Sequence, residues 1–189
     1  MSSDHARDGG FHIVQLGGCE DDPHTLIFEA EIGKISINVV VGAAIDDFKE
    51  TGQVIWPAAP LLSYFLLTKY GQDIIKGRNI VELGAGVGVP GLICAQFAPF
   101  VVLTDHNPAS LRLLAQNAAI NQQSCLTNVS VASLDWDSQV PMDLVSKFDI
   151  VIGADLVFST LVVTSLFSTA KNLLASHPAA LFILSHVSR

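Results

Sequence analysis

The N-terminal part of the chain alternates short apolar runs with turn residues, a pattern typical of β-strands. Strands are predicted at residues 11–16, 25–30 and 34–41, and the turn-rich stretch 17–23 and Gly33 separate them. Residues 1–10 are polar and end in two glycines, which predicts a disordered tail. We therefore expect an antiparallel N-terminal hairpin or small sheet as a β extension over residues 11–53.

From residue 54 onward the hydrophobic pattern changes to an alternation of helices and strands. Five strand candidates occur at residues 79–83, 100–104, 129–133, 148–154 and 180–184. Four helices are expected at residues 57–70, 90–97, 108–121 and 160–176, the first with prolines in its first turn. This order predicts an α/β fold, a doubly wound Rossmann-like parallel sheet with helices on both faces.

The densest local pattern is the stretch Val81–Gly91, where glycines at 84, 86 and 88 lie between a predicted strand and a predicted helix. Residues without a Cβ let backbone N–H groups approach a ligand, and the following helix directs its positive end the same way. Glu82 places a carboxylate at the strand tip, where we expect it to face the ligand. A pyrophosphate would be repelled there, so the pattern favours a cationic nucleotide-like ligand.

Charge and cysteine content narrow the partners and the compartment. The 189 residues include 10 Lys and Arg against 18 Asp and Glu, a net charge of −8 that disfavours nucleic acid and suits a protein partner. Cys19, Cys94 and Cys125 form no Cys-x-x-Cys pair, which predicts neither a metal site nor a disulfide framework. No signal peptide is visible, and glycines and prolines interrupt the uncharged span 83–104, so we expect no membrane segment and a cytoplasmic, or nuclear, protein.

Polar residues at the predicted strand ends form the candidate site, because ligands of doubly wound sheets bind beyond the carboxyl ends of the strands. Asp105 follows Gly86 by 19 positions, where a carboxylate can accept hydrogen bonds from ribose hydroxyls. The alternative is that Asp105 caps the next helix. Its neighbour His106 is a candidate for contact with adenine or ribose, and the alternative is a solvated loop histidine. Asn117 and Asn121 are interpreted as surface or packing residues.

Four motifs, in order, resemble lysine methyltransferase family 16, the methyltransferase-like 21 group and its relatives among the class I (seven-β-strand) S-adenosylmethionine-dependent methyltransferases. They are Val54–Ala58, Glu82–Gly91, Leu134–Trp136 and Asp149–Phe158, and the resemblance covers most of residues 28–189. It implies that residues 54–189 form an S-adenosylmethionine-binding domain. It also implies that Trp56, Gly84, Ala85, Gly86, Asp105, Trp136 and Ala154 line the cofactor site. We add Glu82, Gly88, His106 and Asp135 as further candidate cofactor-binding residues.

The same resemblance assigns catalysis to Asp155 and Phe158, which stand for an Asp-x-x-Tyr/Phe signature facing the substrate. Asp155 is expected to orient the incoming nitrogen and Phe158 to wall its channel; the alternatives are a cap on the following helix for Asp155 and core packing for Phe158. Trp56 and Trp136 offer flat faces for adenine or a cation, against an alternative of core packing.

The resemblance implies an S-adenosylmethionine-dependent protein N-methyltransferase, with lysine the expected acceptor and arginine or histidine left open. The family's sheet normally continues past the fifth strand, so we expect this chain to lack the last strands of the fold and to expose a strand edge that permits self-association. The alternative function is therefore a truncated, inactive cofactor-binding or interaction module. A nicotinamide dehydrogenase is disfavoured by Glu82, and a nucleic-acid methyltransferase by Ala154–Phe158 and by the net charge.

Overall fold

The structure is a computed structural model that describes residues 11–15, 23–30, 33–42, 52–122 and 126–188. The predicted tail at 1–10 lies outside these residues, as do Cys19 and Cys125.

A five-stranded parallel sheet forms the centre of the molecule, which confirms the predicted fold class. Its strand order is β6-β5-β4-β7-β8, so the order reverses between β4 and β7. The strands are β4 (Asn79–Glu82), β5 (Phe100–Asp105), β6 (Val129–Ser133), β7 (Ile150–Ala154) and β8 (Leu181–Ser185). Buried Val and Ile residues fill β4 and β7, as expected for strands that are covered on both faces.

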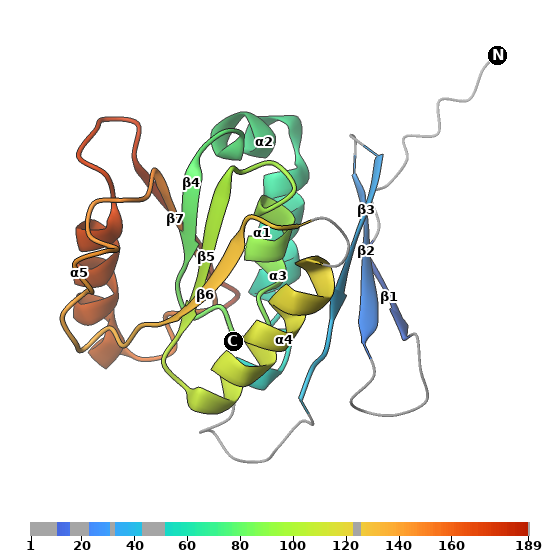
Figure 1. Cartoon of the computed structure of the whole chain (residues 1–189), viewed down its shortest axis with the longest axis horizontal. Helices are drawn as coiled ribbons and strands as arrows, with labels where there is room; N and C mark the ends of the chain where they lie inside the picture. Colours follow the sequence, from blue (N-terminus) through green and yellow to red (C-terminus); the bar gives the residue numbers. More distant parts are fainter. Residues whose placement is uncertain (1–10, 16–22, 31–32, 43–51, 123–125, 189) are drawn as a thin grey trace.

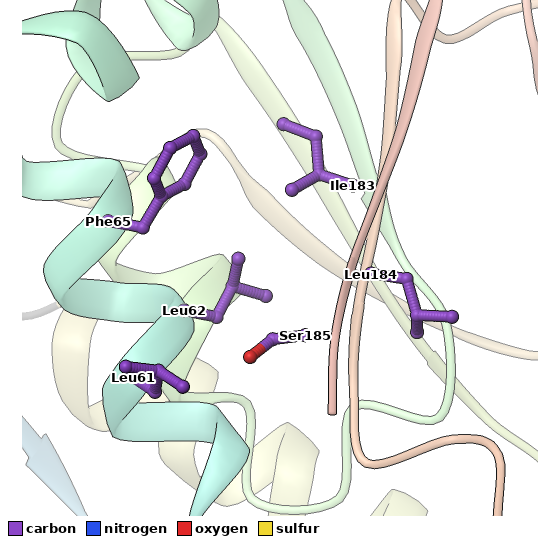
Figure 2. Close-up of a pocket in the computed structure, with 6 residues that line it drawn as sticks. All are labelled: Leu61, Leu62, Phe65, Ile183, Leu184 and Ser185. Atoms are coloured by element: carbon purple, nitrogen blue, oxygen red, sulfur yellow. The ribbon is translucent and has the colours of Figure 1, made fainter. Parts of the chain in front are cut away.

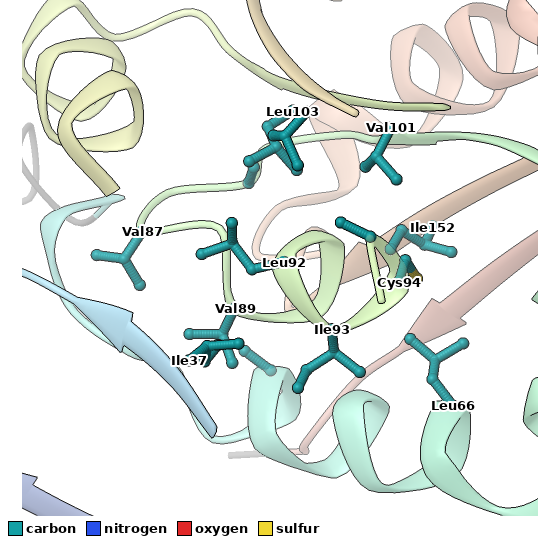
Figure 3. Close-up of a cluster of buried hydrophobic side chains, with 14 of the residues drawn as sticks. Ile37, Leu66, Val87, Val89, Leu92, Ile93, Cys94, Val101, Leu103 and Ile152 are labelled. Carbon is teal, nitrogen blue, oxygen red and sulfur yellow. The ribbon is translucent and has the colours of Figure 1, made fainter. Parts of the chain in front are cut away.

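Helices cover both faces of this sheet (Figure 1). Helices α1 (Ala58–Leu67), α3 (Val89–Cys94) and α4 (Pro108–Gln122) contribute to one apolar cluster, while α5 (Val163–Leu173) contributes to the other. Figure 3 shows α3 at the centre of the first cluster, with Leu103 and Ile152 on its sheet side and Ile37 and Leu66 on the other. The short α3 is thus held on every side, which fixes the glycine turn that precedes it.

The predicted antiparallel N-terminal sheet is present and packs outside the first helical layer. It consists of β1 (Phe11–Gln15), β2 (His24–Ala30) and β3 (Gly33–Val39), in that order. Leu26 and Phe28 of β2 and Ile37 and Val39 of β3 point inward and are buried, at the two-residue spacing of a sheet with one covered face. The sheet therefore completes the core on the side of α1, α3 and α4.

Three predicted helices differ from the structure, and the one expected at 90–97 is α3, which ends at Cys94. The helix expected at 57–70 ends at Leu67, and α2 (Lys69–Ile75) begins after it, because Thr68 is extended and its side chain accepts a hydrogen bond from the Gly71 N–H. The helix expected at 160–176 begins as a 3-10 turn (Thr160–Val162) and continues as α5 only to Leu173. Among the described residues, no helix is long and apolar enough to cross a membrane.

Candidate active site

The glycine turn between β4 and α3 has the backbone shape that only glycine adopts readily. Gly84, Gly86 and Gly88 have φ angles of 54°, 55° and 86°, all in the left-handed region. Ala85 between them donates its N–H to the Thr104 carbonyl of β5 at 2.8 Å, and its own carbonyl accepts the Gly88 N–H at 2.8 Å. The alternation of glycines in the sequence therefore encodes a turn that is anchored to the neighbouring strand.

Each of these glycines faces a different neighbour. A Cβ on Gly86 would lie 2.7 Å from the carbonyl oxygen of Gly52, and one on Gly88 would lie 2.6 Å from Leu114 of α4. A Cβ on Gly84 would lie 2.8 Å from Leu156 and 3.2 Å from the Trp136 ring. Gly88 thus permits the packing of α4, while Gly84 lies against Leu156 and Trp136 and the buried Gly86 lies against Gly52.

The prediction that the Glu82 carboxylate faces the ligand is wrong for this structure. Glu82 is only 2% exposed, and its Oε2 accepts a hydrogen bond of 2.8 Å from the Gly91 N–H. Burial raises its pKa to about 8, the Gly91 hydrogen bond opposes the rise, and the nearby Asp105 charge adds to it. Glu82 lies beneath the turn and fastens the first turn of α3 to β4.

Asp105, at the end of β5, connects the glycine turn to the start of α4. Its Oδ2 accepts the Gly86 N–H at 3.1 Å and its Oδ1 accepts the Asn107 N–H at 2.9 Å. The alternative role of helix cap belongs to Asn107, whose side chain accepts the Ala109 N–H at 2.8 Å. The exposed His106 has its Nδ1 3.8 Å from Asp105 Oδ1. Asp105 therefore does not cap α4 and lies against the turn, and ribose binding by its carboxylate stays a prediction.

The loop after β6 brings Trp136 to the glycine turn. The Trp136 ring approaches Gly84 and is half-buried against the apolar cluster that α5 covers. Asp135 is exposed and its Oδ1 accepts the Asp137 N–H at 3.0 Å, which shapes the loop. Ala154 ends β7 opposite Ser185, and Trp56 is half-buried just before α1. A contact of any of these with a cofactor remains a prediction.

Asp155 fastens α1 and the C-terminal segment to the end of β7. Its Oδ2 accepts the Ala58 N–H at 3.1 Å and its Oδ1 accepts the Val187 N–H at 3.0 Å, with a φ angle of 56°. Asp155 thereby caps α1, which precedes it in the chain. Ser159 caps the 3-10 turn Thr160–Val162 that follows, so the alternative that Asp155 caps the following helix is wrong. His186 Nδ1 lies 3.5 Å from Asp155 Oδ1.

Phe158 does not belong to the core. Its side chain is 74% exposed, which excludes the packing alternative and leaves an aromatic ring three residues from Asp155 on the surface. An exposed aromatic ring beside the carboxyl edge is available for contact with a partner.

The asparagines of α4, interpreted from the sequence as surface or packing residues, are buried and hold β3. Asn117 Oδ1 accepts the Val40 N–H at 2.7 Å, while its Nδ2 donates to the carbonyls of Val40 and Val87, both at 3.0 Å. Asn121 makes the corresponding pair with Asn38, at 3.0 and 2.6 Å. Their spacing of four residues on one helix face was the only sequence signal for this role.

Of the predicted residues, Glu82, Asp105 and Trp136 thus lie against the glycine turn, whereas Asp155 contacts α1 and the C-terminal segment at the end of β7. A separate apolar pocket of about 280 Å³ lies between α1 and β8, lined by Leu61, Leu62, Phe65, Ile183, Leu184 and Ser185 (Figure 2). Within the described ranges, no three His, Cys, Asp or Glu side chains group as metal ligands do.

Comparison with known proteins finds similar sequences among methyltransferases. The sequence model of a family described as lysine methyltransferase, methyltransferase family 16, matches residues 41–189. The zebrafish protein N-lysine methyltransferase METTL21A is 33% identical over 130 residues, which are 67% of this chain and 58% of that protein. The mouse histone-arginine methyltransferase METTL23 is 29% identical over 69% of this chain and 51% of its own length. The chain spans about half the length of these curated relatives.

Solved structures support the fold. A putative RNA methyltransferase from Pyrococcus horikoshii superposes with a TM-score of 0.55 at 17% identity, over 79% of this chain and 67% of that one. The family match covers well over half of the chain and includes every residue of the glycine turn and of the strand ends. The chain belongs to the lysine methyltransferase family.

Proposed function

We propose that this protein transfers the methyl group of S-adenosylmethionine to a lysine side chain of a protein partner. The observation that carries this proposal is the turn of left-handed glycines bonded to Asp105 at the point where strand order reverses. Family membership supplies the reaction class, and the net charge of −8 favours a protein over a nucleic acid as partner.

The cofactor is S-adenosylmethionine, with its adenosine on the side of Asp105. Each oxygen of a carboxylate has two acceptor positions, so Asp105 retains capacity for ribose hydroxyls beside its bonds to Gly86 and Asn107. Ala85, Gly84 and Gly86 form the surface under the cofactor, and Trp136 closes its far end. Glu82 supports this surface from below.

Methyl transfer to nitrogen is an in-line displacement, so catalysis depends mainly on alignment. A lysine amine must be neutral to attack the methyl carbon, and a partly desolvated channel lowers its pKa from about 10.4. The exposed Phe158 ring supplies an apolar wall for such a channel. Asp155 fixes the backbone from which Phe158 projects.

Incubation with radiolabelled S-adenosylmethionine and a cell lysate tests the proposal, with Asp105→Ala as the inactive control. A labelled protein band that carries methyl-lysine by mass spectrometry supports it; methyl-arginine would assign the acceptor of the METTL23 relatives instead. Binding of S-adenosylhomocysteine without any labelled protein would favour the second candidate, a cofactor-binding interaction module.

We also propose self-association through the open edge of β8 and a cytoplasmic or nuclear location. Within the described part of the chain β8 pairs only with β7, and the exposed Leu181 flanks its free edge. Light scattering should then detect a dimer that Leu181→Lys disperses, and fluorescence of the tagged protein in cells tests the location.

A further inference from the structure

The first turn of α4 contains a buried hydroxyl that the described structure leaves unsatisfied. Ser110 is 0% exposed, and its Oγ has no hydrogen-bond partner among the described residues. Burying a hydroxyl without a partner is costly, and most buried side-chain hydroxyls in folded proteins are paired. The other buried serine of the helical layer, Ser63, follows this rule and donates to the Ala59 carbonyl at 2.9 Å.

The Ser110 hydroxyl points at the same place as the Asp105 carboxylate. Gly52 occupies that place: a Cβ on Gly52 would collide with Ser110 Oγ and would lie 3.5 Å from Asp105 Oδ2. The carbonyl oxygen of Gly52 also lies over Gly86, at 2.7 Å from where a Cβ would be. Gly52 therefore rests between the hydroxyl, the carboxylate and the glycine turn.

A ribose hydroxyl has the chemistry to satisfy both groups. It donates one hydrogen bond, which the Asp105 carboxylate accepts, and its oxygen accepts one, which the Ser110 O–H donates. We propose that Ser110 is a further cofactor-binding residue, whose hydroxyl donates to a ribose hydroxyl of S-adenosylmethionine once Gly52 shifts away from it. This inference rests on the proposed function, because it requires the cofactor to bind beside Asp105.

Calorimetric titration with S-adenosylhomocysteine tests it in the full chain, with Ser110→Ala and the matched control Ser63→Ala. Loss of one hydrogen bond should weaken binding about 3- to 10-fold in Ser110→Ala and leave the affinity of Ser63→Ala unchanged. The melting temperatures of the two variants without ligand should also differ. Ser110→Ala removes an unsatisfied group and should melt higher by roughly 2–5 °C, whereas Ser63→Ala loses a satisfied bond and should not.

The 2′-deoxy and 3′-deoxy forms of the ligand identify the hydroxyl. One of them should bind Ser110→Ala and the unchanged protein equally, because the bond in question is already missing. Unchanged affinity of Ser110→Ala for S-adenosylhomocysteine, alongside weakened binding by Asp105→Ala, would overturn the role of Ser110 alone. Failure of the unchanged protein to bind S-adenosylhomocysteine would overturn the proposed function as well.

Discussion

The carboxylate of Glu82 accepts a hydrogen bond from the Gly91 N–H at 2.8 Å while it is almost completely buried. The bond ties the tip of β4 to the first turn of α3 across the glycine turn. A Cβ on Gly91 would lie 2.5 Å from Glu82 Oε2, so glycine at this position permits the contact. The acidic residue that marks the motif in the sequence is thus a support for the turn.

Replacement of Glu82 by glutamine should change the pH dependence of stability. The folded pKa of Glu82 is raised from 4.5 to about 8, so between these values the folded protein holds a proton that the unfolded chain has released. Stability contributed by this group therefore falls as pH rises from about 4.5 to about 8. Above that range Glu82→Gln should be more stable than the unchanged protein by on the order of a few kcal/mol, and near pH 4.5 the two should be similar.

Urea unfolding at pH 5, 7 and 9 measures this difference. The matched control is Glu29→Gln, because Glu29 is exposed on β2. Parallel pH profiles for Glu82→Gln and the unchanged protein would contradict a buried, protonated Glu82.

Cofactor binding should release protons near pH 7 to 8. A cationic ligand near the turn favours the charged form of Glu82 and lowers its pKa, so up to about one proton leaves on binding. Titration with S-adenosylmethionine in buffers of different ionisation enthalpy measures the number released. The number of protons released should fall towards zero well above pH 8, where Glu82 is already ionised. In Glu82→Gln it should be close to zero at every pH. Release that persists in Glu82→Gln would assign the proton to another group.

Asn117→Ala should weaken cofactor binding, whereas Asn121→Ala should not. Both residues bond the backbone of the β3 segment, but only Asn117 also bonds the Val87 carbonyl inside the glycine turn. Either change leaves buried backbone groups unpaired and should cost about 1–3 kcal/mol of stability. Denaturant unfolding and calorimetry separate the two effects. Equal affinities in both variants would show that the turn keeps its shape without Asn117.

The sequence predicted this fold well because its signals are local. Apolar runs and the β-then-α order predicted every strand of the central sheet, and the alternating glycines predicted a turn that needs left-handed residues. The role of Asn117 could not be predicted, because its partner Val40 lies 77 positions away and meets it only after the N-terminal sheet has packed. For the same reason the sequence did not show that Asp155 caps a helix 97 positions earlier.

Phe158→Ala should reduce methyl transfer without reducing stability. The ring is 74% exposed, so its removal should change the free energy of unfolding by less than about 0.5 kcal/mol. If it walls the acceptor channel, kcat should fall while the affinity for S-adenosylhomocysteine stays unchanged. Leu161→Ala is the matched control, since Leu161 is 88% exposed three residues further along the same segment. Equal methylation rates in Phe158→Ala and Leu161→Ala would mean that Phe158 takes no part in alignment. Phe158→Tyr should keep the rate of the unchanged protein if an aromatic wall is what matters.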